Sequence, residues 1–334
     1  MNRRAFLSTA AACSVVSASA QYAAEAQPAE RFALAARYSA ERNGATFLVV
    51  RNGIILAESY YGVAADARLP IGHGSRVFMP LLLASLAQDR LLSLDEPVAA
   101  TLGDWGAHPV KSTISIRVLA SGASGVFFDR RDARDLATAI ALEPREAPGV
   151  RFVNDEAPYI LLTEIARRKL EAAGREPDPA RYLTSRTLGP IGCTPIGWTR
   201  AASGAARFDD GVAVSARGWA QVGELIRREG VWRAAQLADD DTLREALRGS
   251  FAESRAGFGL WLAAIARNRD DLNVDSDLWR AQSPAPTDLA MAAGAGGQRL
   301  YVAPSAGLVV VRQTRGGAAQ WSDAQFLSLL WRDL

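Results

Sequence analysis

The sequence predicts an α+β fold with strands at both ends of the chain and helices in the middle. Two apolar, β-branched runs within residues 47–58 flank Asn52-Gly53, a strong turn signal, and therefore predict a β-hairpin. Residues 299–303 and 307–312 form a second hairpin-like pair near the other end. Between these pairs, segments with apolar residues at helical spacing alternate with Gly/Pro turns. Strands are therefore expected at the ends and helices between them.

Four helices show the clearest pattern of apolar side chains. They are expected over residues 77–86, 157–170, 215–228 and 323–334. Pro80 is unfavourable inside the first of them, because an interior proline removes a backbone hydrogen bond and costs about 3 kcal/mol. The start of this helix is therefore expected to be irregular.

The composition is that of a globular protein with no electrostatic preference for nucleic acid. Hydrophobic residues make up 49% of the 334 residues and charged ones 22%, with a formal charge of +2. Without residues 1–20, which contain Arg3 and Arg4 but no acid, the chain has 36 basic and 36 acidic residues. A neutral chain has no electrostatic reason to bind nucleic acid or an anionic membrane. No later segment has about 18 uninterrupted apolar residues, so no membrane span is expected.

Residues 1–26 are expected to be an export signal with its cleavage region. Residues 2–7 (Asn-Arg-Arg-Ala-Phe-Leu) resemble a twin-arginine signal, and a small, apolar run follows them. Residues 18–20 and 24–26 both match an A-x-A cleavage site. This pattern predicts a periplasmic or secreted bacterial protein. After cleavage Cys193 is the single cysteine, so no intramolecular disulfide can form and a buried, unreactive thiol is expected.

Five stretches of the chain resemble, in order, segments of one known family. They are residues 48–53 (LVVRNG), 91–98 (LLSLDEPV), 190–198 (PIGC, then Trp198), 258–261 (FGLW) and 296–304 (Gly296-Gly297-Gln298, then YVAP). Together they extend over about residues 40–334, and five matches in register support one fold. The chain thus resembles the serine β-lactamase-related family, which includes class C β-lactamases, penicillin-binding proteins, esterases and 6-aminohexanoate-dimer hydrolases.

The resemblance implies a β-lactamase/transpeptidase-like architecture. An antiparallel sheet built from both chain ends would be flanked by helices, forming an α/β sandwich with a mostly helical region inserted. The implied sheet domain combines residues 31–98 and 215–334, and the inserted domain covers residues 99–214.

The resemblance also implies where the catalytic residues of such a hydrolase would lie. The family's S-x-x-K motif places a serine and a lysine on one face of a helix, and a desolvated lysine with a lowered pKa helps to activate the serine. Counted back from Asp95, this window puts His73 at the serine position and Arg76 at the lysine position. Arginine keeps its proton and cannot replace lysine as a base. No serine in the chain has a lysine three positions later.

The other two motifs of the family are altered as well. Residues 149–162 resemble its G-x-x-W-x-Y-S-N…L-L stretch, with Asn154 at the tyrosine position and Glu156 at the asparagine position. The chain contains no Y-x-N or S-x-N, and the third window, residues 294–297, has no basic or hydroxyl residue. These losses predict a catalytically degenerate homologue, a pseudoenzyme, that acts by binding a ligand or a partner.

Two other functions stay open. An amidase or esterase with a displaced nucleophile would use Ser75 assisted by His73. Residues two apart on a helix point about 200° apart, so this pairing requires a non-helical backbone. Alternatively, His73 would act as an acid–base catalyst on an anionic substrate.

The inherited pocket is expected to hold a small-molecule ligand or substrate, without a cofactor. Its expected lining is His73, Arg76, Asn154, Asp155, Glu156, Gly296, Gly297 and Gln298. Arg76 would either hold a ligand carboxylate as a bidentate fork or pair with Asp155 or Glu156 in a disused cleft, and the sequence favours the pairing. No metal site is expected, because the chain has only two histidines.

Overall fold

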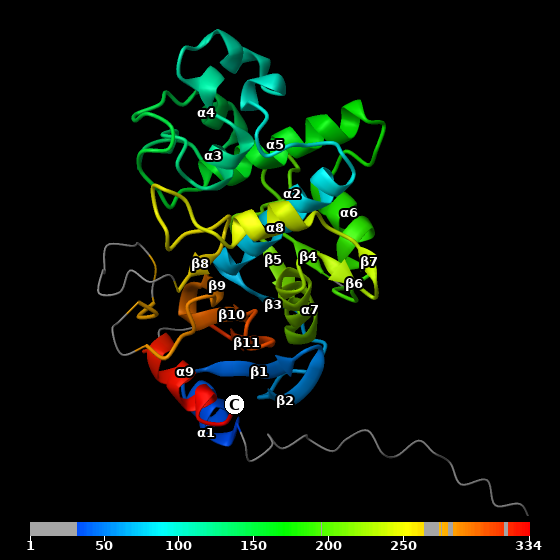
Figure 1. Cartoon of the computed structure of the whole chain (residues 1–334), viewed down its shortest axis with the longest axis vertical. Helices are drawn as coiled ribbons and strands as arrows, with labels where there is room; N and C mark the ends of the chain where they lie inside the picture. The colour runs from blue at the N-terminus through cyan, green and yellow to red at the C-terminus, as the bar shows by residue number, and fades with distance from the viewer. Residues whose placement is uncertain (1–31, 195, 264–273, 275, 280–282, 317–319) are drawn as a thin grey trace, which may run out of the picture.

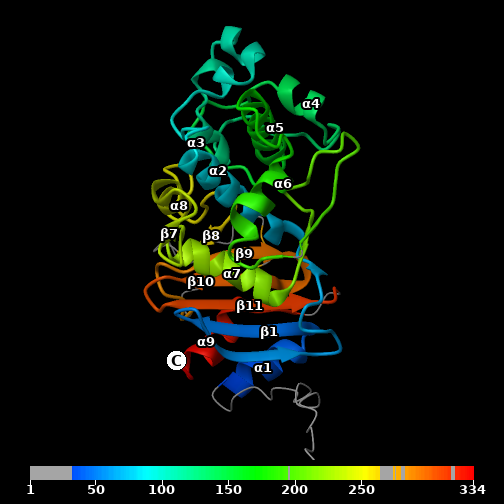
Figure 2. The same cartoon turned by 90° about the vertical axis from the view of Figure 1, so that its right-hand side faces the viewer.

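Both ends of the chain contribute strands to one six-stranded antiparallel sheet (Figures 1 and 2). This computed structural model describes residues 32–334 except residues 195, 264–273, 275, 280–282 and 317–319. The strand order is β2 (Ile54–Tyr60), β1 (Gly44–Arg51), β11 (Leu308–Thr314), β10 (Gln298–Ala303), β9 (Ala290–Gly294) and β8 (Trp261–Leu262). Both predicted hairpins, β1–β2 and β10–β11, are confirmed, and so is the α+β fold built from both chain ends.

The first hairpin turns at Asn52 and Gly53, whose φ angles are 50° and 81°. Two consecutive positive φ angles are typical of a type I′ turn, which fits the twist of the paired strands and favours the Asn-Gly sequence.

Helices bury both faces of the sheet, because side chains alternate along each strand. In β1, Leu48 and Val50 belong to the core on one face, whereas Phe47 and Val49 belong to the core on the other. Helix α7 (Ala216–Arg227) covers the first face, and α1 (Ala33–Ala40) with α9 (Asp323–Trp331) covers the second (Figure 2).

The remaining helices lie beyond α7, in the upper part of Figure 1. They are α2 (Phe78–Gln88), α3 (Ile116–Ala120), α4 (Leu136–Ala141), α5 (Ala157–Ala172), α6 (Pro179–Leu183) and α8 (Asp240–Ala246). Helix α2 packs against α5, α6 and α8, and we call this group of helices the helical region. The boundaries proposed above for the sheet domain and the inserted domain stay a prediction.

Two small sheets accompany the large one. β3 (Leu69–Pro70), β5 (Val212–Val214) and β4 (Gly197–Trp198) form a three-stranded sheet, and β6 (Val231–Trp232) pairs with β7 (Ala235–Gln236). The three-stranded sheet leads directly into the segment that carries His73.

The irregular start expected for the helix around Pro80 is confirmed. A 3₁₀ segment, Gly72–Val77, precedes α2, which begins at Phe78. Pro80 is therefore the third residue of α2, within the first turn, where backbone N–H groups have no intrahelical partner, so the proline removes no helical hydrogen bond.

The proposed export signal, residues 1–26, lies outside the described residues. Among the residues that are described, no helix combines the length and the apolar character needed to cross a membrane.

Cys193 is fully buried and forms no disulfide, and burial raises the pKa of its thiol to about 12. Because the thiolate is the reactive species, we expect iodoacetamide at pH 8 to modify Cys193 in the folded protein at less than about one hundredth of the rate in the unfolded protein. Peptide mapping by mass spectrometry separates Cys193 from Cys13. Equal rates in the two states would contradict the expectation.

Candidate functional site

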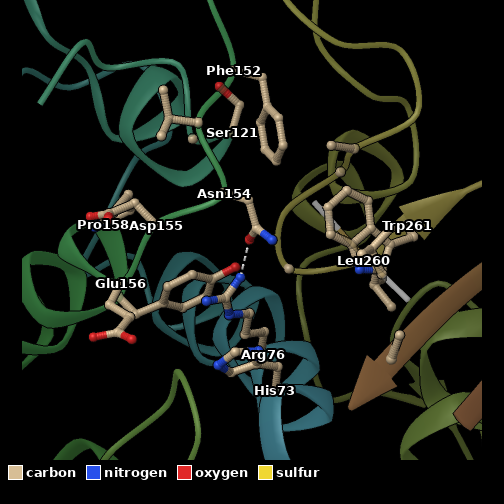
Figure 3. Close-up of a pocket in the computed structure, with 18 of the residues that line it drawn as sticks. His73, Arg76, Ser121, Phe152, Asn154, Asp155, Glu156, Pro158, Leu260 and Trp261 are labelled. Carbon is tan, nitrogen blue, oxygen red and sulfur yellow. Dashed lines mark hydrogen bonds between the residues drawn. The ribbon is translucent and has the colours of Figure 1, made fainter. Parts of the chain in front are cut away.

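A pocket of about 400 Å³ lies between the edge of the large sheet, the 3₁₀ segment and the helical region (Figure 3). Its walls come from separate parts of the chain. The lining residues are His73, Arg76, residues 120–122, Arg134, residues 152–156 and 158–159, residues 256–257 and 259–261, Val274, residues 293–295 and Arg299. Its volume is in the range that proteins use for small organic ligands.

The 3₁₀ segment directs His73 and Arg76 to the pocket and Ser75 away from it. A 3₁₀ helix has three residues per turn, so side chains at positions i and i+3 lie on the same side. His73 and Arg76 have this spacing, and both line the pocket. Ser75 does not line it and is completely buried.

The Ser75 hydroxyl holds the local fold together. It donates a hydrogen bond to the carbonyl of Gly72 at 2.6 Å and accepts two, from the amides of Gly211 at 3.2 Å and Val212 at 2.9 Å. These bonds fix the beginning of β5 to the 3₁₀ segment. The interpretation of Ser75 as a displaced nucleophile assisted by His73 is therefore wrong, because the hydroxyl faces the interior and is fully used there.

Arg76 and Asn154 meet in the pocket. This agrees with the resemblance, which placed both residues at motif positions that line one pocket. The Asn154 side-chain oxygen accepts a hydrogen bond from Nη1 of Arg76 (Figure 3). The Arg76 guanidinium also lies 4.8 Å from the ring centroid of Tyr159, a cation–π distance. Its Nε is buried and has no hydrogen-bond partner in the described part of the chain.

Asp155 and Glu156 do not neutralise Arg76. Oδ1 of Asp155 accepts hydrogen bonds from the amides of Phe128 at 3.2 Å and Ala157 at 2.9 Å, and thus holds the start of α5. Glu156 forms an ion pair with Arg134 at 3.6 Å. Among the described residues, no carboxylate forms an ion pair with Arg76, so the pairing that the sequence favoured is wrong.

The environment of His73 keeps its imidazole neutral. Burial lowers the pKa of His73, and the positive charge of Arg76 lowers it further. Asp210 acts in the opposite direction, with Oδ2 3.9 Å from Nε2 of His73. A neutral imidazole at the pocket wall is compatible with the acid–base role considered above, and that role stays a prediction.

His73 should make the protein less stable in mild acid. Its pKa is lower in the folded chain than in the unfolded chain, where it is about 6.5, so folding is opposed once the pH falls below that value. We expect the free energy of unfolding to fall more steeply from about pH 7 to about pH 5 in the wild type than in His73→Gln, which takes up no proton. Urea denaturation measures both slopes, and a slope in the variant that is equal or steeper would contradict the assignment.

Gly296, Gly297 and Gln298 do not line the pocket, contrary to the prediction. The chain makes a 3₁₀ turn at Ala295–Gly297, in which Gly296 has a φ of 71°. Residues 293–295 line the pocket, and so does Arg299 beyond the turn, whereas residues 296–298 do not. The Gln298 amide instead donates to the carbonyl of Thr314 at 3.0 Å and accepts from its N–H at 3.0 Å.

Several lining residues were not identified as site residues from the sequence. Tyr159 has a recognisable signal, because it lies three residues after Glu156, the N-cap of α5, and residues at this spacing lie on the same side. Phe152, Trp261 and Arg134 also line the pocket, and they come together only through tertiary packing. Within the described residues, no group of three or more His, Cys, Asp or Glu side chains is placed to hold a metal ion.

Comparisons with known proteins agree with this fold. A family model described as Beta-lactamase matches residues 30–320. The chain is similar to a penicillin-binding protein homologue from Caulobacter crescentus, with 16% identity, a TM-score of 0.67, and coverage of 92% of this chain and 98% of that chain. For a beta-lactamase/D-alanine carboxypeptidase from Pseudomonas syringae these values are 14%, 0.65, 91% and 97%.

A solved family VIII carboxylesterase is similar to the same extent, with 14% identity, a TM-score of 0.69, and coverage of 92% of this chain and 98% of that chain. At such low identities the solved structures show a shared fold. None of the curated proteins matches the sequence.

Proposed function

The chain belongs to the beta-lactamase family, and we propose that its pocket binds a small molecule through the ligand's carboxylate but carries out no serine-dependent acyl transfer. The observation that carries this proposal is the state of Arg76, a buried cation at the pocket wall without an anionic partner among the described residues.

Three other buried arginines show how this fold satisfies a buried guanidinium with partners from the chain itself. The exposed fractions are 8% for Arg76, 1% for Arg255, 1% for Arg299 and 0% for Arg312. Arg255 forms a two-pronged ion pair with Glu253, and Arg299 forms one with Asp323. Arg312 donates to the carbonyls of Gly296 and Gly297 and to the hydroxyl of Ser39.

Arg76 differs from these three residues because its Nε has no hydrogen-bond partner in the described part of the chain. Arg299 lines the same pocket, but its guanidinium is paired with Asp323. An unpaired buried charge is unfavourable by several kcal/mol. A ligand carboxylate would offset this cost, since a guanidinium binds a carboxylate through two parallel hydrogen bonds.

The hydroxyl groups at the pocket wall support the absence of acyl transfer. Among the described lining residues, they belong to Ser121 and Tyr159. The Ser121 hydroxyl donates to the carbonyl of Val118 at 3.0 Å, and burial raises the pKa of Tyr159. Neither hydroxyl has a lysine beside it in the pocket lining, and the Arg76 guanidinium cannot accept a proton. The activated nucleophile of a serine hydrolase is therefore missing from this lining.

Two measurements test the proposal. The intact mass of the mature protein after incubation with a fluorophosphonate, and separately with a penicillin, should show no adduct. Ligand-observed NMR should detect binding of propionate and no binding of the neutral, isosteric propionamide. A stoichiometric adduct would overturn the lack of acyl transfer, whereas equal binding of acid and amide would overturn carboxylate recognition.

Export of the chain is a separate proposal, supported by the twin-arginine-like residues 2–7 and the A-x-A sites that follow. Fusion of residues 1–30 to a reporter that is active only after export should give activity in a bacterial host. Exchanging both Arg3 and Arg4 for lysine should remove that activity, and undiminished activity would contradict the assignment.

A further inference from the structure

We infer that the ligand is an aryl carboxylate, whose carboxylate meets Arg76 while its flat ring packs against Phe152 and Trp261. This inference rests on the proposed function and adds the chemical class of the rest of the ligand.

The pocket combines one polar end with one aromatic end. Arg76 and His73 lie together at one side of the cavity, whereas Phe152 and Trp261 border it from other sides (Figure 3). We call Phe152 and Trp261 the aromatic corner. Their ring centroids are 5.9 Å apart, with the planes inclined by 80° in an edge-to-face arrangement. Other apolar side chains that line the pocket include Ala256, Leu260, Val274 and Ala293.

The aromatic corner is held in place from behind. A Cβ at Gly122 would lie 2.9 Å from the Phe152 ring, so the glycine leaves room for the ring to pack on its backbone. The carbonyl of Gly122 also accepts a hydrogen bond from the amide of Val153 at 2.9 Å. On the other side, Trp261 packs edge-to-face on Trp279 at 5.9 Å, and Trp279 Nε1 donates to the carbonyl of Leu262 at 2.8 Å.

A rigid aromatic corner selects a flat apolar group. Two rings set edge-to-face present a ring face and a ring edge, against which a third ring packs in the offset or perpendicular geometry that aromatic pairs prefer. A pre-formed site loses little side-chain entropy on binding. The polar end then orients the ligand. Arg76 is buried at the pocket wall and has no counter-ion among the described residues, so the ligand carboxylate should bind there.

The test compares 3-phenylpropionate with propionate, using isothermal titration or ligand-observed NMR. We expect 3-phenylpropionate to bind the wild type at least about tenfold more tightly than propionate, because burial of an additional apolar group in a formed pocket increases affinity. In Phe152→Leu this ratio should fall to about threefold or less. Trp261→Phe should also lower the ratio, and serves if Phe152→Leu does not fold.

Phe127→Leu is the matched control. Phe127 also packs against arginines, with Arg145 at 5.0 Å and Arg151 at 5.4 Å from its ring centroid, but it does not line the pocket. This variant should keep the full preference for 3-phenylpropionate.

The outcomes separate this inference from the proposed function. Equal affinities for the two acids, with both lost in Arg76→Gln, would overturn the aromatic preference and leave carboxylate binding intact. Binding of neither acid, or binding that Arg76→Gln leaves unchanged, would overturn the proposed function and this inference with it. A preference that persists equally in Phe152→Leu and Trp261→Phe would overturn the placement of the ring at the aromatic corner.

Discussion

Replacement of Arg76 by methionine should weaken propionate binding and at the same time make the unliganded protein more stable. Methionine fills a similar volume without a charge, so the variant no longer buries an unpaired guanidinium. We expect the free energy of unfolding to rise by about 1 kcal/mol, after subtraction of the lost hydrogen bond to Asn154 and the cation–π contact with Tyr159. Affinity for propionate should fall at least about tenfold, since the carboxylate loses its charged partner.

Arg299→Met is the matched control for this change. Arg299 is buried as well, but it forms an ion pair with Asp323, and its removal would leave that carboxylate buried without its cation. Its loss should therefore destabilise the protein by about 3–5 kcal/mol. Urea denaturation of the two variants and the wild type, without ligand, measures both effects. A destabilisation of Arg76→Met as large as that of Arg299→Met would show that Arg76 serves structure instead of binding.

Replacement of Ser75 by alanine should destabilise the protein by about 2–4 kcal/mol. The hydroxyl is completely buried, and its loss leaves the amides of Gly211 and Val212 without their acceptor. An unsatisfied buried donor costs about 1–3 kcal/mol, and alanine offers no replacement. Because Ser75 does not line the pocket, the affinity for propionate should not change.

Ser112→Ala is the control for Ser75→Ala. The Ser112 hydroxyl is exposed and donates to the carbonyl of Pro109 at 3.4 Å, so its removal should change the free energy of unfolding by less than about 0.5 kcal/mol. Equal stability of Ser75→Ala and the wild type, measured by urea denaturation, would contradict the structural role of Ser75. If Ser75→Ala lost an ester hydrolysis activity while its stability stayed unchanged, Ser75 would again be the candidate nucleophile.

From the sequence alone, two terminal hairpins, the main helices and the family could be predicted, because these depend on local patterns. Alternating apolar residues around Asn52-Gly53 specify a hairpin wherever it lies in the fold. Helices α5 and α7 were predicted to within two residues at each end, since Ser215 caps α7 and apolar residues repeat along both. The resemblance to the family also implied that Arg76 and Asn154 share the pocket, because they occupy successive motifs, and the two side chains do meet there.

Only the tertiary structure decided the roles of the site residues. Whether Ser75 faced the pocket depended on a 3₁₀ backbone that no local pattern distinguishes from an α-helix, although Pro80 indicated an irregularity. The charge of Arg76 could be satisfied by Asp155, by Glu156 or by a ligand, and the choice depended on Phe128, Ala157 and Arg134 occupying those two carboxylates.

The aromatic corner was also inaccessible from the sequence. Phe152 and Trp261 are more than a hundred residues apart in the chain, and an aromatic residue at either position is equally compatible with a buried core. Their arrangement beside Arg76 follows from the packing of the helical region on the edge of the sheet, because contacts between distant segments are set by the shape of the whole core and not by neighbouring residues.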